Sequence, residues 1–260
     1  MKIALIGCGN IGKFLLKCIN IDGVVPGAKI VGIFTRNELE AHQLADEFAT
    51  EHFVTIQSLI KSNVDLVIEA ATVQVVKDFA KGILESGKDI VLSSVGALAD
   101  VNFYNSLKRI CQEKGTKIYL PSGAIGGLDI LKAAKSVGEL YTVSIITRKP
   151  PHALPGAPLD KEHVLFDGSA ADAIELFPKN INVSIILALA GVGTDKTGVK
   201  IISDPAIMKN SHSIEATGSF GKLSLQVEND PMPNNPRTSY LAALSVLSAL
   251  KNKDSVIQVG

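Results

Sequence analysis

The sequence contains no tryptophan, and only 5% of its 260 residues are aromatic. Its three cysteines, Cys8, Cys18 and Cys111, form no pairing pattern, which argues against a disulfide framework and favours a reducing, cytoplasmic environment. The 26 basic and 26 acidic residues leave no net charge, so neither nucleic acid nor an anionic membrane is an expected partner. No apolar run approaches the roughly 20 residues of a membrane span. Because Met1 leads directly into an apolar stretch, we expect no signal peptide.

Patterns of metal ligands are also missing. The histidines show no ligand spacing with cysteine or carboxylate, so no metal is expected; they are His42, His52, His152, His163 and His212. The sequence is instead rich in aliphatic residues, since 46% of it is hydrophobic although aromatics are rare. This composition suits an α/β protein with one large core or two smaller ones.

A glycine motif follows the first expected strand. Residues 3–6 are continuously apolar, as in a strand buried on both faces, and residues 13–19 are expected to be helical. Between them stands Gly7-Cys8-Gly9-Asn10-Ile11-Gly12, the G-x-G-x-x-G pattern of a dinucleotide site in its strand–turn–helix setting. The three glycines allow a tight turn, close approach to a pyrophosphate, and close helix packing, while the helix start offers N–H donors. The expected contacts are Gly7, Gly9, Asn10, Ile11 and Gly12.

The end of the second expected strand, 29–34, bears on the choice of cofactor. An acidic residue usually stands here to bind the ribose 2′-hydroxyl, but the sequence reads Thr35-Arg36-Asn37. Thr35 can donate to a 2′-phosphate and Arg36 can pair with it, which favours NADP over NAD, or use of both. Two alternatives remain open: Arg36 is a surface charge or stacks on the adenine, and Glu38 binds the ribose.

Strands and helices then alternate, which predicts a doubly wound parallel sheet of the Rossmann type. Further strands are expected at 66–70, 89–92 and 117–120, and helices at 38–48, 73–86 and 101–114. Ligands bind such sheets at the carboxyl ends of the strands. Small and polar residues at these ends are therefore expected to contact the cofactor; they are Ala71, Thr72 and Ser94, besides Thr35 and Arg36.

The second half predicts a smaller mixed α/β domain with an open sheet. We expect strands at 140–148 and 200–203, a hairpin of 211–217 with 222–228, and helices at 130–137, 170–177, 183–190 and 237–250. The polar stretch 152–163 is expected to form a loop that acts as a lid. His212 shares an apolar strand face with Ile214 and Ala216, so these residues alone favour a core histidine over a catalytic one.

Four separated motifs carry a resemblance that runs along the whole chain. They are Gly123-Ala124-Ile125-Gly126-Gly127-Leu128-Asp129, Phe177-Pro178-Lys179-Asn180-Ile181-Asn182-Val183, Asp204-Pro205 with Asn210-Ser211-His212-Ser213-Ile214, and Asn235-Pro236-Arg237-Thr238-Ser239. Together they are similar to the L-aspartate dehydrogenases. The resemblance implies oxidation of L-aspartate with NAD or NADP to iminoaspartate, which hydrolyses to oxaloacetate and ammonia and can feed NAD biosynthesis.

The resemblance also implies a division of the chain and roles for single residues. Residues 1–121 and 233–260 would form the dinucleotide-binding domain and 122–232 the catalytic domain, whose sheet can pair two subunits into a homodimer. His212 matches the catalytic histidine of the family, and Ala124 and Asn182 match cofactor-contacting positions. A histidine with a pKa near neutrality can take the ammonium proton or activate water. The candidates for holding the substrate are Lys149, Lys179, Asn180 and Arg237.

Competing functions are separated by single features of the sequence. A sugar dehydrogenase of the glucose–fructose type would show Glu-Lys-Pro where Ser93-Ser94-Val95 stands, a semialdehyde dehydrogenase would need a cysteine nucleophile at the domain junction, and a dihydrodipicolinate reductase would show paired histidines. Two alternatives stay open: an oxidoreductase of another small amino or oxo acid, and a redox sensor that binds NAD(P) without catalysis.

Overall fold

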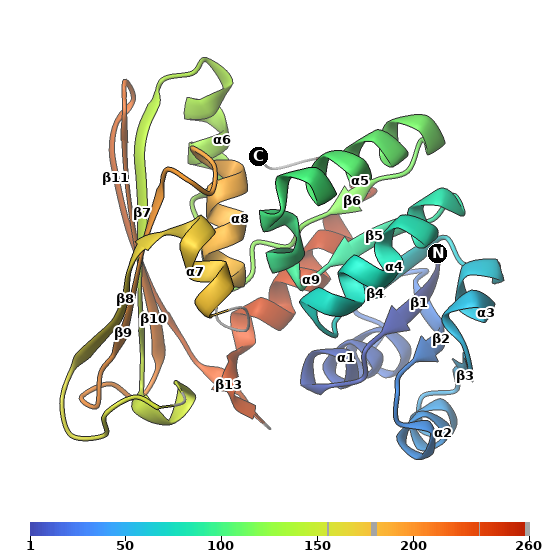
Figure 1. Cartoon of the computed structure of the whole chain (residues 1–260). Helices are drawn as coiled ribbons and strands as arrows, with labels where there is room; N and C mark the ends of the chain where they lie inside the picture. The colour runs from blue at the N-terminus through green and yellow to red at the C-terminus, as the bar shows by residue number, and fades with distance from the viewer. Residues whose placement is uncertain (155, 178–180, 234, 258–260) are drawn as a thin grey trace. The chain divides into compact units, whose positions relative to one another are not determined.

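The computed structural model describes residues 1–154, 156–177, 181–233 and 235–257, without the side chains of 235–237. The described chain forms two compact units, residues 1–121 with 246–257, and residues 122–245. Figure 1 labels their helices and strands. We describe each unit separately.

The first unit is built on a parallel sheet of six described strands in the order β3-β2-β1-β4-β5-β6. This order reverses direction between β1 and β4, which is the arrangement of a Rossmann fold and confirms the expected doubly wound sheet. The strands are Lys2–Ile6 (β1), Lys29–Phe34 (β2), Glu51–His52 (β3), Leu66–Glu69 (β4), Asp89–Leu92 (β5) and Ile118–Tyr119 (β6).

The helices of this unit connect successive strands, and capping residues mark several of their ends. They are Asn10–Leu16 (α1), Glu38–Glu47 (α2), Ile56–Lys61 (α3), Val73–Glu85 (α4) and Val101–Lys114 (α5), with a π-helical turn at Lys17–Ile21 (η1) and a 3₁₀ turn at Val95–Ala99 (η2). The Asp100 carboxylate accepts hydrogen bonds from the first N–H groups of α5, and Gly115 ends that helix at φ +70°. These caps bound the helix expected at 101–114, whereas β3 and α3 were not predicted.

The core of the first unit lies where the apolar run of β1 predicted it. Residues 3–6 are at most 2% exposed, and they pack among the buried aliphatic side chains of β2, β4 and α1. Val246, Leu247 and Leu250 from the C-terminal part of the chain belong to the same cluster. The last helix therefore contributes to the core of the unit that begins at residue 1.

The second unit contains a five-stranded mixed sheet in the order β11-β10-β7-β9-β8, in which β7 and β9 are parallel and the other neighbours antiparallel. The strands are Leu140–Lys149 (β7), His163–Ser169 (β8), Thr197–Ser203 (β9), Asn210–Gly218 (β10) and Gly221–Asn229 (β11). Helices Leu128–Ser136 (α6), Ala170–Leu176 (α7) and Asn182–Ala190 (α8) lie against one face of this sheet, and a 3₁₀ turn spans Pro151–Ala153 (η3) (Figure 1). The expected mixed domain with an open sheet is thereby confirmed.

The predicted helix over 237–250 is wrong at its beginning. Residues Asn235–Ser239 form a strand (β13) that pairs with Pro231–Met232 (β12), and the helix Tyr240–Asn252 (α9) starts after it. The backbone N–H of Tyr240 donates to the carbonyl of Asp230 over 2.8 Å, which ties the helix start to this short hairpin. Pairing of two such short strands leaves no periodic pattern, so local periodicity could not predict this hairpin.

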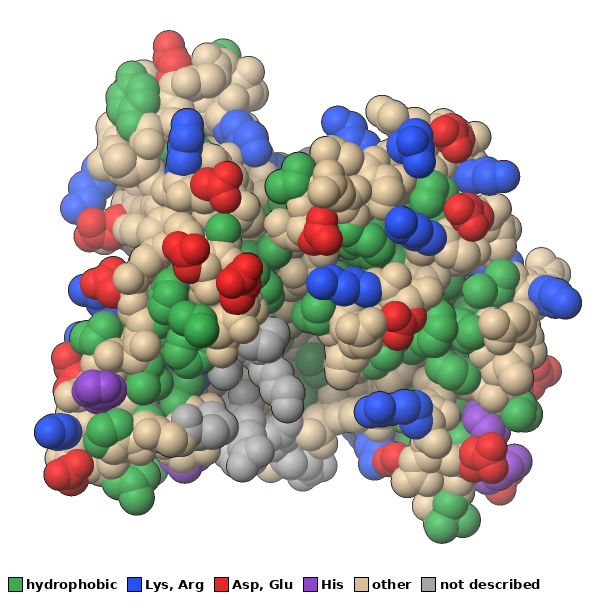
Figure 2. Space-filling view, in the orientation of Figure 1, with side chains coloured by type: hydrophobic (Ala, Val, Ile, Leu, Met, Phe, Trp, Pro, Cys, Tyr) green, Lys and Arg blue, Asp and Glu red, His purple; other side chains and the backbone are tan. Residues whose placement is uncertain are grey.

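Charges of both signs are mixed on the face of the molecule shown in Figure 2. On the face shown in Figure 2, lysine and arginine side chains alternate with aspartate and glutamate. Among the described residues, no helix is both long and apolar enough to cross a membrane. Within the same residues, no group of three or more His, Cys, Asp or Glu side chains is placed to hold a metal ion.

Candidate functional site

The glycine turn between β1 and α1 has the geometry that the motif requires. Gly7 has φ +93°, and a Cβ on it would lie 2.7 Å from the Ala70 carbonyl oxygen. A Cβ on Gly12 would lie only 2.1 Å from the carbonyl oxygen of Gly7. Gly9 differs, because a Cβ there would meet no atom within 4 Å. Two glycines are thus needed by the fold itself, while Gly9 borders open space that a pyrophosphate could occupy. Asn10 and Ile11, the other expected contacts, open α1.

The residues expected to determine the choice between NADP and NAD lie at the carboxyl end of β2. Thr35 is half-buried, whereas Arg36 and Glu38 are exposed, and Arg36 forms no ion pair with a described residue. Asn37 caps α2 by accepting a hydrogen bond from the Glu40 N–H. Lys13, directly after the glycine motif, pairs with Glu40 over 2.6 Å. Lys13 is therefore a further cation near the glycine turn that the sequence reasoning did not single out.

The side chain of Glu69 links the carboxyl ends of β4 and β5, and the sequence analysis did not predict it as a site residue. Glu69, the last residue of β4, is 1% exposed. Its carboxylate accepts hydrogen bonds from the N–H of Ala71 (2.7 Å) and from the N–H and hydroxyl of Ser94 (3.0 and 2.9 Å). Thr72 caps α4 by accepting from the Val75 N–H. A charged residue inside an otherwise apolar strand was the signal that could have identified Glu69.

His212 occupies the covered face of the second sheet, as its alternation with Ile214 and Ala216 predicted. It is 3% exposed, and its Nδ1 lies 3.0 Å from the hydroxyl oxygen of Thr147 on the neighbouring strand β7. Burial, together with the positive charge of Lys149, lowers the pKa of His212 to about 3. This value lies below the near-neutral pKa expected from the sequence, first because the imidazole is almost completely buried and second because a cation is buried beside it.

A row of polar side chains follows His212 on the same covered face of the sheet. Lys149 is paired with Ser203 across β7 and β9, and Asn210 with Asn229 across β10 and β11. All four are at most 8% exposed, and burial lowers the pKa of Lys149 to about 8. Among the described residues, Ser203 Oγ and Asn229 Oδ1 have no hydrogen-bond partner. Unsatisfied buried polar atoms are costly, which marks this end of the sheet as a place for a polar ligand.

The Gly123–Gly127 segment connects to this row through Asn229. The side-chain nitrogen of Asn229 donates to the carbonyl oxygen of Ala124 over 3.1 Å, and Ala124 is 4% exposed. Because a carbonyl can only accept, this bond fixes Oδ1 of Asn229 as the atom without a partner. The alternation of Asn210 with His212 was the signal by which the sequence could have revealed the polar row.

The remaining expected site residues are only partly described. Asn182 is the first residue of α8 and is half-buried. Lys179 and Asn180 lie outside the described residues, and for Arg237 the structure describes the backbone within β13 but not the side chain. The structure thus brings together His212, Lys149 and, through Asn229, Ala124.

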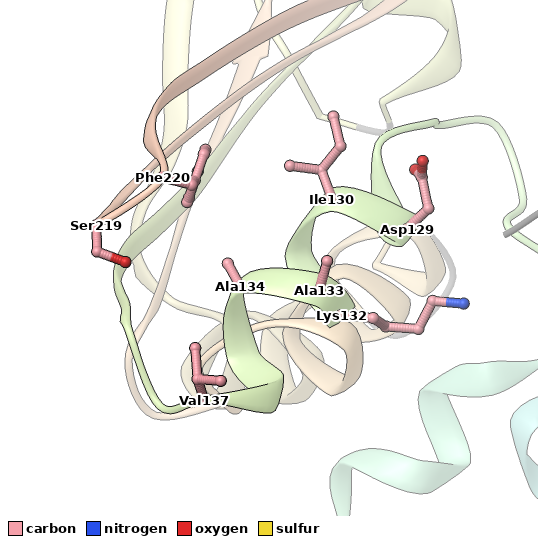
Figure 3. Close-up of a pocket in the computed structure, with 8 residues that line it drawn as sticks. All are labelled: Asp129, Ile130, Lys132, Ala133, Ala134, Val137, Ser219 and Phe220. Atoms are coloured by element: carbon pink, nitrogen blue, oxygen red, sulfur yellow. The ribbon is translucent and has the colours of Figure 1, made fainter.

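A cavity of about 790 Å³ lies elsewhere in the second unit, between α6 and the turn that joins β10 to β11. Figure 3 shows Ile130, Val137 and Phe220 on its walls, with Lys132 and Asp129 at its side. The cavity adjoins the end of β10 that lies away from His212. At roughly 3.3 Å per residue, this end is about 20 Å from His212 along the strand. We assign no role in the reaction to this cavity.

Comparisons with known proteins match both units. The family model "Homoserine dehydrogenase, NAD binding domain" matches residues 7–121, and "Aspartate dehydrogenase, C-terminal" matches residues 129–253. The chain is 41% identical to the L-aspartate dehydrogenase of Methanosarcina barkeri and 38% identical to that of Nitrosopumilus maritimus, in each case over 100% of this chain and 99% of the relative.

Solved structures give the same result for the fold. Aspartate dehydrogenase from Thermotoga maritima superposes with a TM-score of 0.82 at 30% identity, over 100% of this chain and 99% of the other. Scyllo-inositol dehydrogenase from Lactobacillus casei, solved with NAD(H) and scyllo-inositol, has a TM-score of 0.59 at 14% identity, over 96% and 87% of the two chains. The second likeness concerns the fold alone.

Proposed function

Because the chain belongs to the aspartate dehydrogenase family of NAD(P)-dependent oxidoreductases, we propose that it oxidises L-aspartate to iminoaspartate, which water converts to oxaloacetate and ammonia, or carries out the reverse amination. The observation that supports this most is the buried imidazole of His212 beside the buried cation of Lys149, at the polar end of a largely apolar sheet face. A dicarboxylic amino acid carries carboxylates that suit the cation and an ammonium proton that suits the imidazole.

The glycine turn of this chain fits a nicotinamide dinucleotide, because Gly9 leaves space where a pyrophosphate would lie. When bound, NAD(P)⁺ accepts a hydride at C4 of its nicotinamide ring. The chain's own contribution in the first unit is to hold the cofactor. The residues proposed for this are Gly7, Gly9, Asn10, Ile11, Gly12, Thr35, Arg36, Ala71, Thr72 and Ser94, with Ala124 and Asn182 from the second unit.

His212 is proposed as the acid–base group of the reaction. Its low pKa keeps the imidazole neutral at pH 7, so it can accept a proton from the substrate ammonium or from water. Acceptance at Nε2 requires the tautomer in which Nδ1–H donates to the Thr147 hydroxyl. Two substrate carboxylates nearby would offset the charge of Lys149 and raise the pKa of His212 when substrate binds.

Lys149 is proposed to bind a substrate carboxylate, with Lys179, Asn180 and Arg237 as further candidates. Replacement of Lys149 by methionine should raise the KM for L-aspartate by about 10- to 100-fold, because a buried charge-assisted hydrogen bond is lost. The same change removes a positive charge that lowers the pKa of His212, so the acidic limb of the kcat/KM profile should move to higher pH. Steady-state kinetics measure the KM, and a pH profile of kcat/KM extended down to the lowest pH at which the protein stays folded measures the movement of the limb.

The control for this variant is Lys200→Met, which removes a half-buried cation from the other face of the same sheet. Lys200 lies on β9 and pairs with Asp167 over 2.7 Å, away from His212. Its replacement should leave both the KM and the pH profile within about twofold of wild type, as for most exposed ion pairs. Equal behaviour of the two variants would remove Lys149 from the substrate site.

Arg36 is the residue proposed to favour NADP. Arg36→Ala should raise the KM for NADPH about tenfold and the KM for NADH by less than about twofold, because a charge-assisted bond to the 2′-phosphate is worth roughly 1.5–3 kcal/mol. Kinetics with both cofactors at saturating substrate measure the ratio. Glu38→Gln tests the alternative in which Glu38 binds the ribose, since the KM for NADH should then rise. An equal effect of Arg36→Ala on both cofactors would reduce Arg36 to a surface charge.

One assay tests the proposed reaction. Oxidation of NADPH and NADH is followed at pH 7–8 with oxaloacetate and ammonium, and with other small oxo acids in place of oxaloacetate. Turnover that depends on oxaloacetate and ammonium supports the proposal. Turnover with a different oxo acid changes the substrate, and cofactor binding without any turnover favours a redox sensor instead.

The arrangement of the whole protein belongs to the same proposal. We assign cofactor binding to residues 1–121 with 233–260 and the substrate site to 122–232. The open sheet supports a homodimer, since α6, α7 and α8 cover one of its faces and strand β11 forms one edge. Cytoplasmic residence rests on the unpaired cysteines, all three of which are free thiols.

A further inference from the structure

Glu69 is the only buried acidic side chain among the described residues, and no described cation forms an ion pair with it. It lies at the carboxyl end of β4, which neighbours β1 and the glycine turn. Its two oxygens are held by Ala71 and Ser94 from the segments that follow β4 and β5. A buried charge without a partner of opposite sign is costly, so this carboxylate calls for an explanation.

The hydrogen bonds around Glu69 suit a carboxylate rather than a neutral acid. Each oxygen accepts from a backbone N–H, one from Ala71 and one from Ser94, and neither N–H can accept a proton in return. Burial raises the pKa of Glu69, and the hydrogen bonds from Ser94 and Ala71 oppose that rise by stabilising the ionised form. The donor set therefore favours the ionised form at the ends of β4 and β5, against the net rise in pKa that burial causes.

The strand order of the sheet indicates which half of a bound dinucleotide would lie near the Glu69 carboxylate. In a sheet of order 3-2-1-4-5-6 the ligand lies across the point where the order reverses, with one mononucleotide over each half. The adenosine half belongs to β1 and β2, where the acidic or basic residue for the ribose stands. The nicotinamide half would therefore lie over β4 and β5, at the sheet edge where Glu69 ends β4.

On the premise of the proposed function, we propose that the Glu69 carboxylate makes the site bind the oxidised cofactor more tightly relative to the reduced one. The oxidised nicotinamide ring carries a positive charge, and the reduced ring is neutral. A fixed negative charge beneath the ring therefore stabilises NAD(P)⁺ selectively. The positively charged ring would in turn provide the opposite charge that no described cation gives to Glu69.

If Glu69 had a purely structural role, its loss would change the dissociation constants of the cofactors in a different way. If the carboxylate only joins the segments after β4 and β5, its loss weakens binding of both cofactor forms alike. If its charge acts on the ring, its loss changes the ratio of the two dissociation constants. A unit charge about 10 Å away, at an effective dielectric constant of ~20, changes such a ratio on the order of tenfold.

The experiment measures dissociation constants of NAD⁺, NADH, NADP⁺ and NADPH by titration calorimetry, without substrate. In Glu69→Gln we expect the ratio Kd(oxidised)/Kd(reduced) to rise about tenfold over wild type. Asp89→Asn is the matched control, because it makes the same kind of change at the opposite end of β5, where Asp89 accepts from the Lys117 N–H and lies 3.6 Å from Lys253. Its ratio should stay within about twofold of wild type.

Glu69→Asp keeps the charge and shortens the side chain, so it should weaken both forms while preserving the ratio. If Glu69→Gln does not fold, Glu69→Ser replaces it, since the smaller side chain leaves room for water to meet the two N–H groups. An unchanged ratio in the neutral variant, or an equal change in Asp89→Asn, would overturn the proposal. Because only binding is measured, absence of aspartate turnover would refute the proposed reaction without affecting this result.

Discussion

Replacement of His212 by alanine is expected to lower the turnover of L-aspartate by about 10²- to 10⁴-fold, the usual contribution of a general acid or base. The dissociation constants of the cofactors should stay within about twofold, because the proposed pyrophosphate and ribose contacts all lie in the first unit. The measurement combines steady-state kinetics with cofactor titration. A variant that loses turnover and cofactor binding together would indicate a disturbed fold rather than lost chemistry.

Two further variants make this test specific. His163→Ala removes an exposed histidine from strand β8 of the same sheet and should leave turnover unchanged. Thr147→Val removes the hydroxyl that contacts Nδ1 and should lower turnover by roughly tenfold, because the imidazole then loses the partner that selects its tautomer. Unchanged turnover in His212→Ala would remove this imidazole from the mechanism.

Replacement of Gly9 by valine is expected to abolish cofactor binding at concentrations that saturate wild type, with little change in the melting temperature. The site of the new Cβ has no atom within 4 Å, and the backbone at Gly9, with φ −69° and ψ −166°, suits an L-residue. The chain therefore accommodates the side chain, which occupies the space proposed for the pyrophosphate. Titration calorimetry and thermal unfolding measure the two properties separately.

The comparison variant is Gly12→Ala in the same turn. Its Cβ would lie 2.1 Å from the Gly7 carbonyl oxygen, so the backbone has to move and the melting temperature should fall by several degrees. A single methyl group thus disturbs the fold at position 12, while a larger side chain at position 9 disturbs only binding. Tight cofactor binding by Gly9→Val would show that the pyrophosphate lies elsewhere.

The first half of the fold followed from the sequence because each local signal agreed with its neighbours. The apolar run before Gly7 gave β1, Asp100 and Gly115 bounded α5, and the regular alternation of strands and helices gave the parallel sheet. The second half was harder to predict. The hairpin of β10 and β11 showed clear alternation, but β8 was not recognised and residues 237–239 were assigned to a helix instead of β13.

The residues of the candidate site were likewise predicted only in part. The glycine turn and the face of His212 could be predicted, since both depend on spacing within one segment. The row of Lys149, Ser203, Asn210 and Asn229 was not predicted as a whole. Asn210 alternates with His212 along one strand, but the place of Lys149 beside Ser203 depends on the register between strands β7 and β9. Glu69 stood out only as a charged residue in an apolar strand, and its hydrogen bonds with Ser94, 25 residues away, could not be read from the sequence. Pairings of this kind leave no trace in local periodicity.

The polar end of the second sheet also has a consequence for how this protein tolerates change. A buried ammonium, a buried imidazole and two unsatisfied oxygen atoms all lower the free energy of unfolding relative to an apolar layer of the same shape. Aliphatic substitutions there would make the protein more resistant to heat while removing its chemistry. Selection for activity therefore acts against robustness at these few positions, and screens for thermostable variants will tend to recover inactive ones.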